Sequence, residues 1–124
     1  MLRLSLAILA LFPLLLSVAR AEPNVVVTIK PLHSLVAAVM QGKGSPELII
    51  TGAASPHDFT LKPSQARALE KADVVFWIGE GLESSLIKPI SSLSGNARVV
   101  ELAEAEGLKL LPYRKDEDFA HHSD

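Results

Sequence analysis

Residues 51–59 read TGAASPHDF, a run of small and helix-breaking residues followed by a histidine, an aspartate and a phenylalanine. An apolar, strand-like run at residues 48–50 precedes it, and a helix-like run occupies residues 63–71. In an open parallel α/β sheet, the loop that leaves the C-terminal end of a strand is where ligands bind. This stretch therefore predicts a strand, a ligand-binding loop and a helix in succession.

Strand-like and helix-like segments alternate along the chain on both sides of this loop. Residues 25–29 and 73–78 are almost wholly apolar, which is typical of strands buried on both faces. Further strands are predicted at residues 46–51 and 98–102. Such strands, separated by helices, pair in parallel through right-handed crossovers. The predicted fold class is therefore α/β, a parallel β-sheet flanked by helices in a Rossmann-like lobe.

Three helices are expected between the strands. The first begins at Pro31 and ends before Gly42, and its apolar stripe is predicted to face the core; the stripe comprises Leu32, Leu35, Val36, Val39 and Met40. The second covers residues 63–71, with Gln65 predicted on the outer face. The third covers residues 80–93, where Pro89 is expected to kink or divide it. No G-x-G-x-x-G, P-loop or G-x-S-x-G motif is present, so a dinucleotide or serine-hydrolase site is not indicated.

His57 is the main candidate for a functional residue. Gly52 and Pro56 shape the loop that presents its imidazole, which is the commonest protein ligand of zinc. A lone loop histidine is more often solvated or hydrogen-bonded, because a metal site needs further ligands. His33 is interpreted as a surface or cap-region histidine, and Glu80 and Glu83 as structural residues favoured by a helix dipole in the first turn of the third helix.

Composition limits the class of protein. The net charge is −2, and it becomes more negative without the first 21 residues, which carry Arg3 and Arg20. This balance argues against nucleic acid and against an anionic membrane surface as partners. There is no cysteine, so disulfides and thiolate metal ligands are excluded. A soluble monomer is expected.

Residues 1–21 have the pattern of a secretory signal peptide. Arg3 precedes an apolar run, and Ala19-Arg20-Ala21 is a small-x-small motif, so cleavage is predicted after Ala21 and the periplasm is the expected destination. Residues 22–112 are expected to form one α/β metal-binding lobe. Residues 113–124 are charged, lack an apolar period and are expected to begin a flexible, histidine-containing loop.

Three segments resemble the periplasmic solute-binding proteins of ABC-type zinc uptake systems, within the larger group that binds zinc, manganese or iron. They are VTIKPLHSLV at residues 27–36, GAASPHDF at 52–59 with LKPS at 61–64, and ADVVFWIGEGLE at 72–83. Together they span most of the chain after residue 21, in the order in which the family has them. The resemblance implies an N-terminal lobe of a two-lobe protein that captures zinc and delivers it to a membrane permease.

The resemblance also implies which residues bind metal. His57 matches the family's first metal-binding histidine, and residues 116–124, with His121 and His122, look like the beginning of the family's histidine-rich acidic loop. The other family ligands follow that loop and come partly from a second lobe, which is absent here, so the chain is expected to be the first part of such a protein. Zinc is favoured over manganese because histidines suit borderline-soft metals.

Two other functions stay open from the residues alone. One is an enzyme that uses His57 and Asp58 as an acid–base pair, but no nucleophile or bound cofactor is found, so an enzyme is not expected. The other is a binding lobe for an organic solute, with His57 donating a hydrogen bond and Trp77 stacking on the ligand. A manganese- or iron-binding member of the same family is a further alternative.

Overall fold

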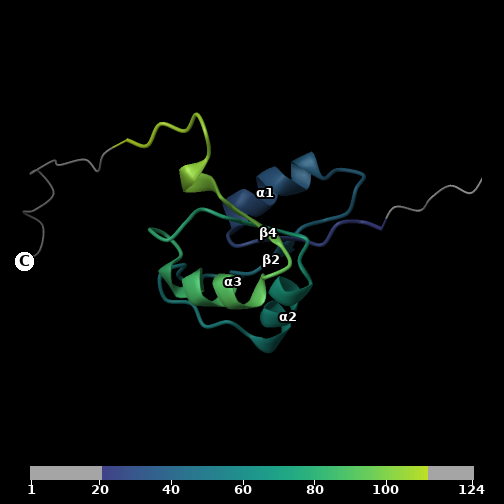
Figure 1. Ribbon diagram of the computed structural model, residues 1–124, viewed down its shortest axis with the longest axis horizontal. Coiled ribbons are helices and arrows are strands. Elements are labelled where there is room, and N and C mark those ends of the chain that lie inside the picture. The colour runs from purple at the N-terminus through teal and green to yellow at the C-terminus, as the bar shows by residue number, and fades with distance from the viewer. Residues whose placement is uncertain (1–20, 112–124) are drawn as a thin grey trace, which may run out of the picture.

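The computed structural model describes residues 21–111, which form a four-stranded sheet between two layers of helices (Figure 1). The expected signal peptide, apart from Ala21, and the expected flexible loop at 113–124 lie outside the described residues. The elements in chain order are β1 (Val25–Val27), α1 (Lys30–Val39), β2 (Glu47–Leu48), α2 (Pro63–Lys71), β3 (Val74–Trp77), the 3₁₀ turn η1 (Ser84–Leu86), α3 (Ile87–Leu93), β4 (Arg98–Glu101) and the 3₁₀ turn η2 (Leu102–Glu104).

All strand pairs are parallel, and the strand order is β2-β1-β3-β4. The connection through α1 lies on one face of the sheet, whereas α2 and α3 lie on the other (Figure 1). The connection leaving β1 therefore turns to one side and the connection leaving β3 to the other. Such a switch point between neighbouring strands is where open α/β sheets usually bind ligands. The predicted fold class is confirmed.

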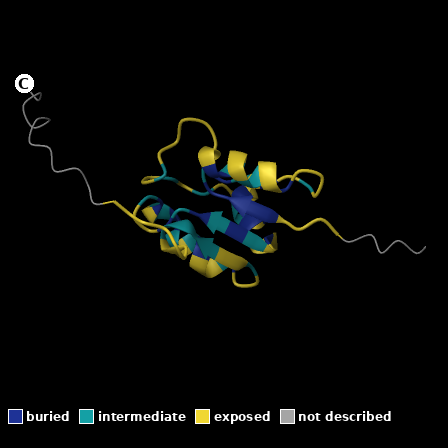
Figure 2. Cartoon of the chain, turned by 90° about the horizontal axis from the view of Figure 1, so that it is seen from above, coloured by how far each residue is buried: buried dark blue, intermediate teal, exposed yellow. Residues whose placement is uncertain are grey.

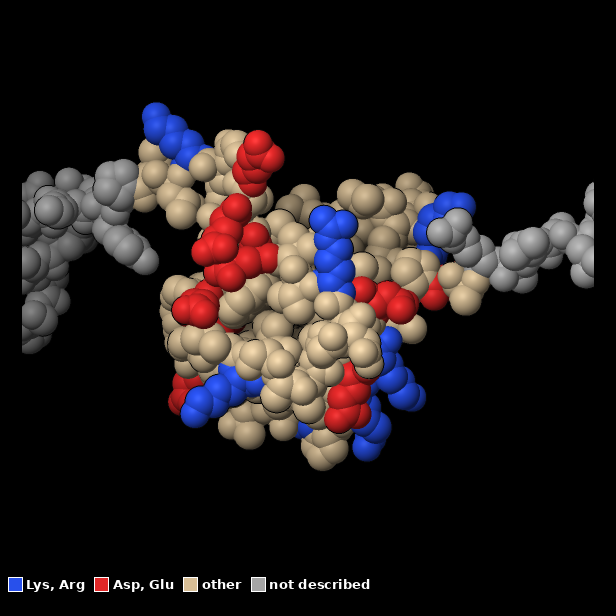
Figure 3. All heavy atoms as spheres, viewed as in Figure 1, with Lys and Arg blue, Asp and Glu red and all other residues tan. Residues whose placement is uncertain are grey.

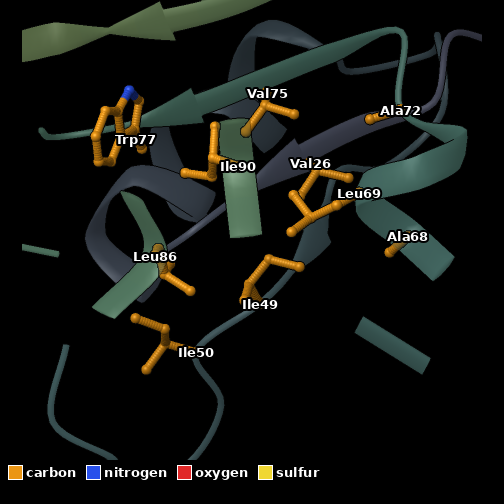
Figure 4. Close-up of a cluster of buried hydrophobic side chains, with 10 residues drawn as sticks. All are labelled: Val26, Ile49, Ile50, Ala68, Leu69, Ala72, Val75, Trp77, Leu86 and Ile90. Atoms are coloured by element: carbon orange, nitrogen blue, oxygen red, sulfur yellow. The ribbon is translucent and has the colours of Figure 1, made fainter. Parts of the chain in front are cut away.

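The main core lies between the sheet and the pair α2 and α3 (Figure 4). Val26 pairs with Val75 in register, so both side chains point to the same face. They meet apolar residues of the two helices, and the buried cluster comprises Val26, Ile49, Ile50, Ala68, Leu69, Ala72, Val75, Trp77, Leu86 and Ile90. Figure 2 shows a buried central strand, β1, between helices whose outer surfaces are exposed.

The apolar stripe predicted for the first helix is only partly buried. Leu32 and Met40 are buried, but Leu35 is 68% exposed and Val39 is 86% exposed. The side of α1 that packs against β1 and β2 includes the half-buried His33 and Ala37, so Leu35 and Val39 lie on the outer side of the helix. The third helix is divided near Pro89 as predicted: η1 precedes α3, and Pro89 lies in the first turn of α3, where its missing N–H costs no hydrogen bond.

None of the helices within residues 21–111 is long and apolar enough to cross a membrane. On the described surface seen in Figure 3, Lys and Arg side chains are scattered and form no broad basic patch.

Candidate metal-binding loop

His57 lies in the loop between β2 and α2, beyond the C-terminal end of the sheet. Its side chain is exposed, as are those of Asp58 and of residues 51–55. The loop begins where the β2 pairing ends, since Ile50 N–H donates to Thr28 O at 2.8 Å. It leaves through Gly52, whose φ of +74° lies in the left-handed region that glycine tolerates best. The loop therefore presents the imidazole to solvent rather than to the protein interior.

The start and the end of this loop are joined by one buried side chain, that of Gln65. Its Nε2 donates to Ile49 O at 2.7 Å, and its Oε1 accepts from Lys62 N–H at 2.8 Å. The prediction that Gln65 faces outward is therefore wrong: it is 7% exposed. The sequence contained a signal for this arrangement, because a glutamine three residues after an N-cap position commonly bonds back to the cap N–H.

Glu83 is a buried structural residue, but its role differs from the predicted one at the start of a helix. Its side chain has 0% exposure, and its Oε2 accepts from the N–H groups of Ile78 and Gly79, each at 2.9 Å. Its Oε1 accepts from the hydroxyl of Thr28. Glu83 thus ties the end of β1 to the end of β3 and fills the switch point. It does not sit in the first turn of an α-helix, because α3 begins only at Ile87.

Other polar residues near this edge have structural partners or face solvent. Glu80 is exposed and lies in the turn after β3, so the prediction that it occupies the first turn of the third helix is wrong. The ring Nε2 of His33 lies 3.0 Å from Pro46 O, so this histidine links the start of α1 to the segment before β2. Trp77 is only 5% exposed and belongs to the core, so it offers no face for stacking an organic solute.

The described residues bring no complete metal site together. Within residues 21–111 there is no cluster of three or more histidines, aspartates and glutamates able to hold a metal ion. His57 is thus brought to the surface outside any such group in this part of the chain. His121 and His122, the other predicted ligands, lie outside the described residues.

One hollow near the sheet edges adjoins the His57 loop. It has a volume of about 240 Å³ and is lined mainly by apolar residues of that loop, the start of α1 and Leu82. A larger hollow of about 330 Å³ lies beside the N-terminal ends of β1 and β2, with Glu47 and Arg67 in its wall. The larger one is at the wrong end of the strands for the predicted site, so geometry favours the smaller one as the neighbourhood of a ligand.

Comparison with known proteins identifies a family and related sequences that this chain matches. A family model described as ZnuA, the periplasmic component A of a zinc-uptake complex, matches residues 25–124. The high-affinity zinc uptake system protein ZnuA of Brucella abortus (strain 2308) is 51% identical over 106 residues, which cover 86% of this chain and 32% of that protein. The chain therefore spans about a third of the length of the curated relatives that it matches.

Solved structures share the fold. The periplasmic zinc-binding protein TroA from Treponema pallidum superposes with a TM-score of 0.59 at 28% identity, covering 64% of this chain and 28% of that one. A manganese-bound periplasmic metal-binding protein from candidatus Liberibacter asiaticus gives a TM-score of 0.62 at 14% identity, covering 75% and 35%. The second likeness bears on the fold alone.

Proposed function

This chain belongs to the ZnuA family of periplasmic zinc-uptake components, and from this premise we propose that it captures zinc in the periplasm and delivers it to the membrane permease of an ABC-type importer. The family is one of transport components rather than enzymes. The observation that carries the proposal is the position of His57. It is exposed on the loop after β2, at the ligand-binding edge of a sheet with the family's fold.

His57 acts as one zinc ligand through a neutral ring nitrogen. Within residues 21–111 the exposed imidazole has no hydrogen-bond partner to give up, and it undergoes little further desolvation when it binds a cation. Zinc in a tight site takes about four ligands in tetrahedral geometry, so one imidazole gives only weak binding. The remaining ligands are supplied by polypeptide outside residues 21–111, and His121 and His122 serve as a loose collecting site.

The proposal extends to the export of the chain and to its oligomeric state. A leader at residues 1–21 directs the chain to the periplasm and is removed after Ala21, and the mature protein works as a monomer. Cysteine is absent from residues 1–124, so the zinc ligands that this part of the protein supplies are histidines and carboxylates.

A zinc titration of the full chain, including any sequence that follows residue 124, tests the proposal. Replacing His57 by alanine is expected to weaken zinc binding by about 100-fold, since a tight site loses one of roughly four ligands. Asp58→Asn is the matched control, because Asp58 is the exposed neighbour in the same loop. Unchanged zinc affinity in the His57→Ala variant would contradict the role of His57.

Two further readouts sharpen this test. Zinc affinity is expected to fall as the pH is lowered, because protons and zinc compete for the same imidazole nitrogen. Manganese, titrated under the same conditions, is expected to bind more weakly than zinc, because imidazole ligands suit zinc better. Tighter binding of manganese would favour the alternative of a manganese-transporting member of the wider group.

A further inference from the structure

The loop that carries His57 has few contacts of its own. Residues 51–55 are exposed, and the local hydrogen bond is from His57 N–H to Ser55 Oγ at 3.3 Å. A loop held only in this way samples many conformations, and fixing it on a metal costs conformational entropy. A precise ligand position therefore requires contacts from elsewhere in the fold.

Contacts at the tip of the loop come from the segment after β3. Ser85 Oγ donates to Pro56 O at 3.1 Å, and Ser84 Oγ lies 3.4 Å from His57 O. The Ser85 bond is the shorter of the two and is half-buried, so it is the stronger restraint. These bonds act on the carbonyl groups of the two residues that set the direction of the imidazole.

The two serines are themselves held by the residue before them. Glu83 is fully buried and accepts hydrogen bonds from Thr28, Ile78 and Gly79 at the ends of β1 and β3. Ser84 and Ser85 follow Glu83 directly, so their positions are fixed relative to the sheet. At the base of the loop, Gln65 joins its start and its end through Ile49 O and Lys62 N–H.

We infer that Ser85 and Gln65 are positioning residues for His57, with Gln65 closing the base of the metal-binding loop and Ser85 fixing its tip. This inference rests on the proposed function for its consequence, the affinity for zinc. The restraint itself exists in the metal-free protein. Because the loop is ordered before zinc arrives, less entropy is lost on binding.

Substitution of Ser85 gives the sharpest test. In the full chain, Ser85→Ala is expected to weaken zinc binding by roughly tenfold, the lower end of the range for residues that orient a ligand. Ser85→Thr keeps the hydroxyl and is expected to restore most of the affinity. Ser92→Ala is the matched control, because Ser92 is an exposed α3 serine that bonds only to Lys88 O and Pro89 O in its own helix.

A double substitution separates positioning from general destabilisation. If Ser85 acts through His57, adding Ser85→Ala to the His57→Ala variant changes zinc affinity no further. Equal effects of Ser85→Ala in both backgrounds would overturn the inference, as would a Ser85→Ala variant that binds zinc as tightly as Ser92→Ala.

Backbone ¹⁵N relaxation of the metal-free protein distinguishes this inference from the proposed function. Ser85→Ala and Gln65→Met are each expected to increase fast motion of the His57 amide, with β3 unaffected. The Ser85→Ala variant could show increased motion of the His57 amide while the His57→Ala variant keeps its zinc affinity. This result would contradict the proposed function but support Ser85 as a restraint on the loop. Unchanged motion of the His57 amide in the folded Ser85→Ala variant would overturn the inference, regardless of the measured zinc affinity.

Discussion

Two connections leave the same edge of the sheet and differ in almost every physical respect. The turn after β3, residues 79–83, contains a buried glycine and a fully buried glutamate whose oxygens accept three protein hydrogen bonds. The loop after β2, residues 51–59, is mostly exposed and has few bonds of its own. The turn after β3 stabilises the fold, whereas the His57 loop exposes an imidazole that, under the proposed function, binds zinc.

The contrast bears on where the proposed metal ligand lies. In an open α/β sheet the switch point between β1 and β3 is the usual ligand crevice. Here the Glu83 side chain fills it, and the lone pairs of its carboxylate are directed at N–H and O–H groups of the protein. The metal-binding candidate is therefore displaced outward, to the loop after the neighbouring edge strand β2.

Removal of the Glu83 side chain should have the largest effect on the stability of the fold. Glu83→Ala leaves the N–H groups of Ile78 and Gly79 and the Thr28 hydroxyl buried without their acceptor, so the free energy of unfolding is expected to fall by about 3 kcal/mol. Urea denaturation measures this change. Glu80→Ala is the control, and an equal loss for this exposed residue would contradict the account.

Gly79→Ala should have the next largest effect. Gly79 has a φ of +142°, and an added Cβ would collide with the Glu101 carboxylate. The Glu101 side chain can move aside, so most of the cost is backbone strain, and the free energy of unfolding is expected to fall by about 2 kcal/mol. Thermal unfolding followed by circular dichroism checks this value, and unchanged stability would show that the turn is less constrained than its geometry indicates.

Gly52→Ala probes the His57 loop in a comparable way. Gly52 also has positive φ, +74°, but no atom of the described residues lies within 4 Å of an added Cβ. Only the left-handed backbone is penalised, so the expected loss in the free energy of unfolding is about 1 kcal/mol. Gly81→Ala is the control, because Gly81 has open space and no positive φ. A loss for Gly52→Ala larger than that for Gly79→Ala would reverse the comparison between the two connections.

His57→Ala should have the smallest effect on stability. The side chain is exposed and accepts or donates no hydrogen bond within the described part of the chain, so the free energy of unfolding is expected to change by less than about 0.5 kcal/mol. Urea denaturation of metal-free protein makes the comparison. A loss similar to that of Glu83→Ala would show that His57 is a structural residue.

Much of the fold could be predicted from local sequence patterns. The apolar runs at 25–29 and 73–78 identified β1 and β3, and the alternation with helices required parallel pairing. The burial of α1 could not be predicted in full, because Leu35 and Val39 belong to the apolar stripe yet lie on the exposed side of the helix. The side of a helix that faces the sheet is set by packing between segments that are far apart in the sequence.

The site was predictable only in part. The position of His57 after β2 follows from the small-residue loop beside a strand, but the partners of that loop do not. Ser85 is 29 residues from Pro56, and nothing in the sequence near either residue marks the bond between them. Glu83 and Glu80 likewise follow β3 within a few residues of each other, and only the fold makes one buried and the other exposed. His57 as a metal ligand remains a prediction.

A crystal structure of the full chain grown with zinc, with anomalous diffraction recorded at the zinc absorption edge, tests the role of His57 most directly. The account predicts an anomalous peak about 2.0–2.1 Å from a ring nitrogen of His57, the usual zinc–imidazole distance. A fully occupied zinc peak at the high-affinity site with the His57 ring turned away from it would contradict the account.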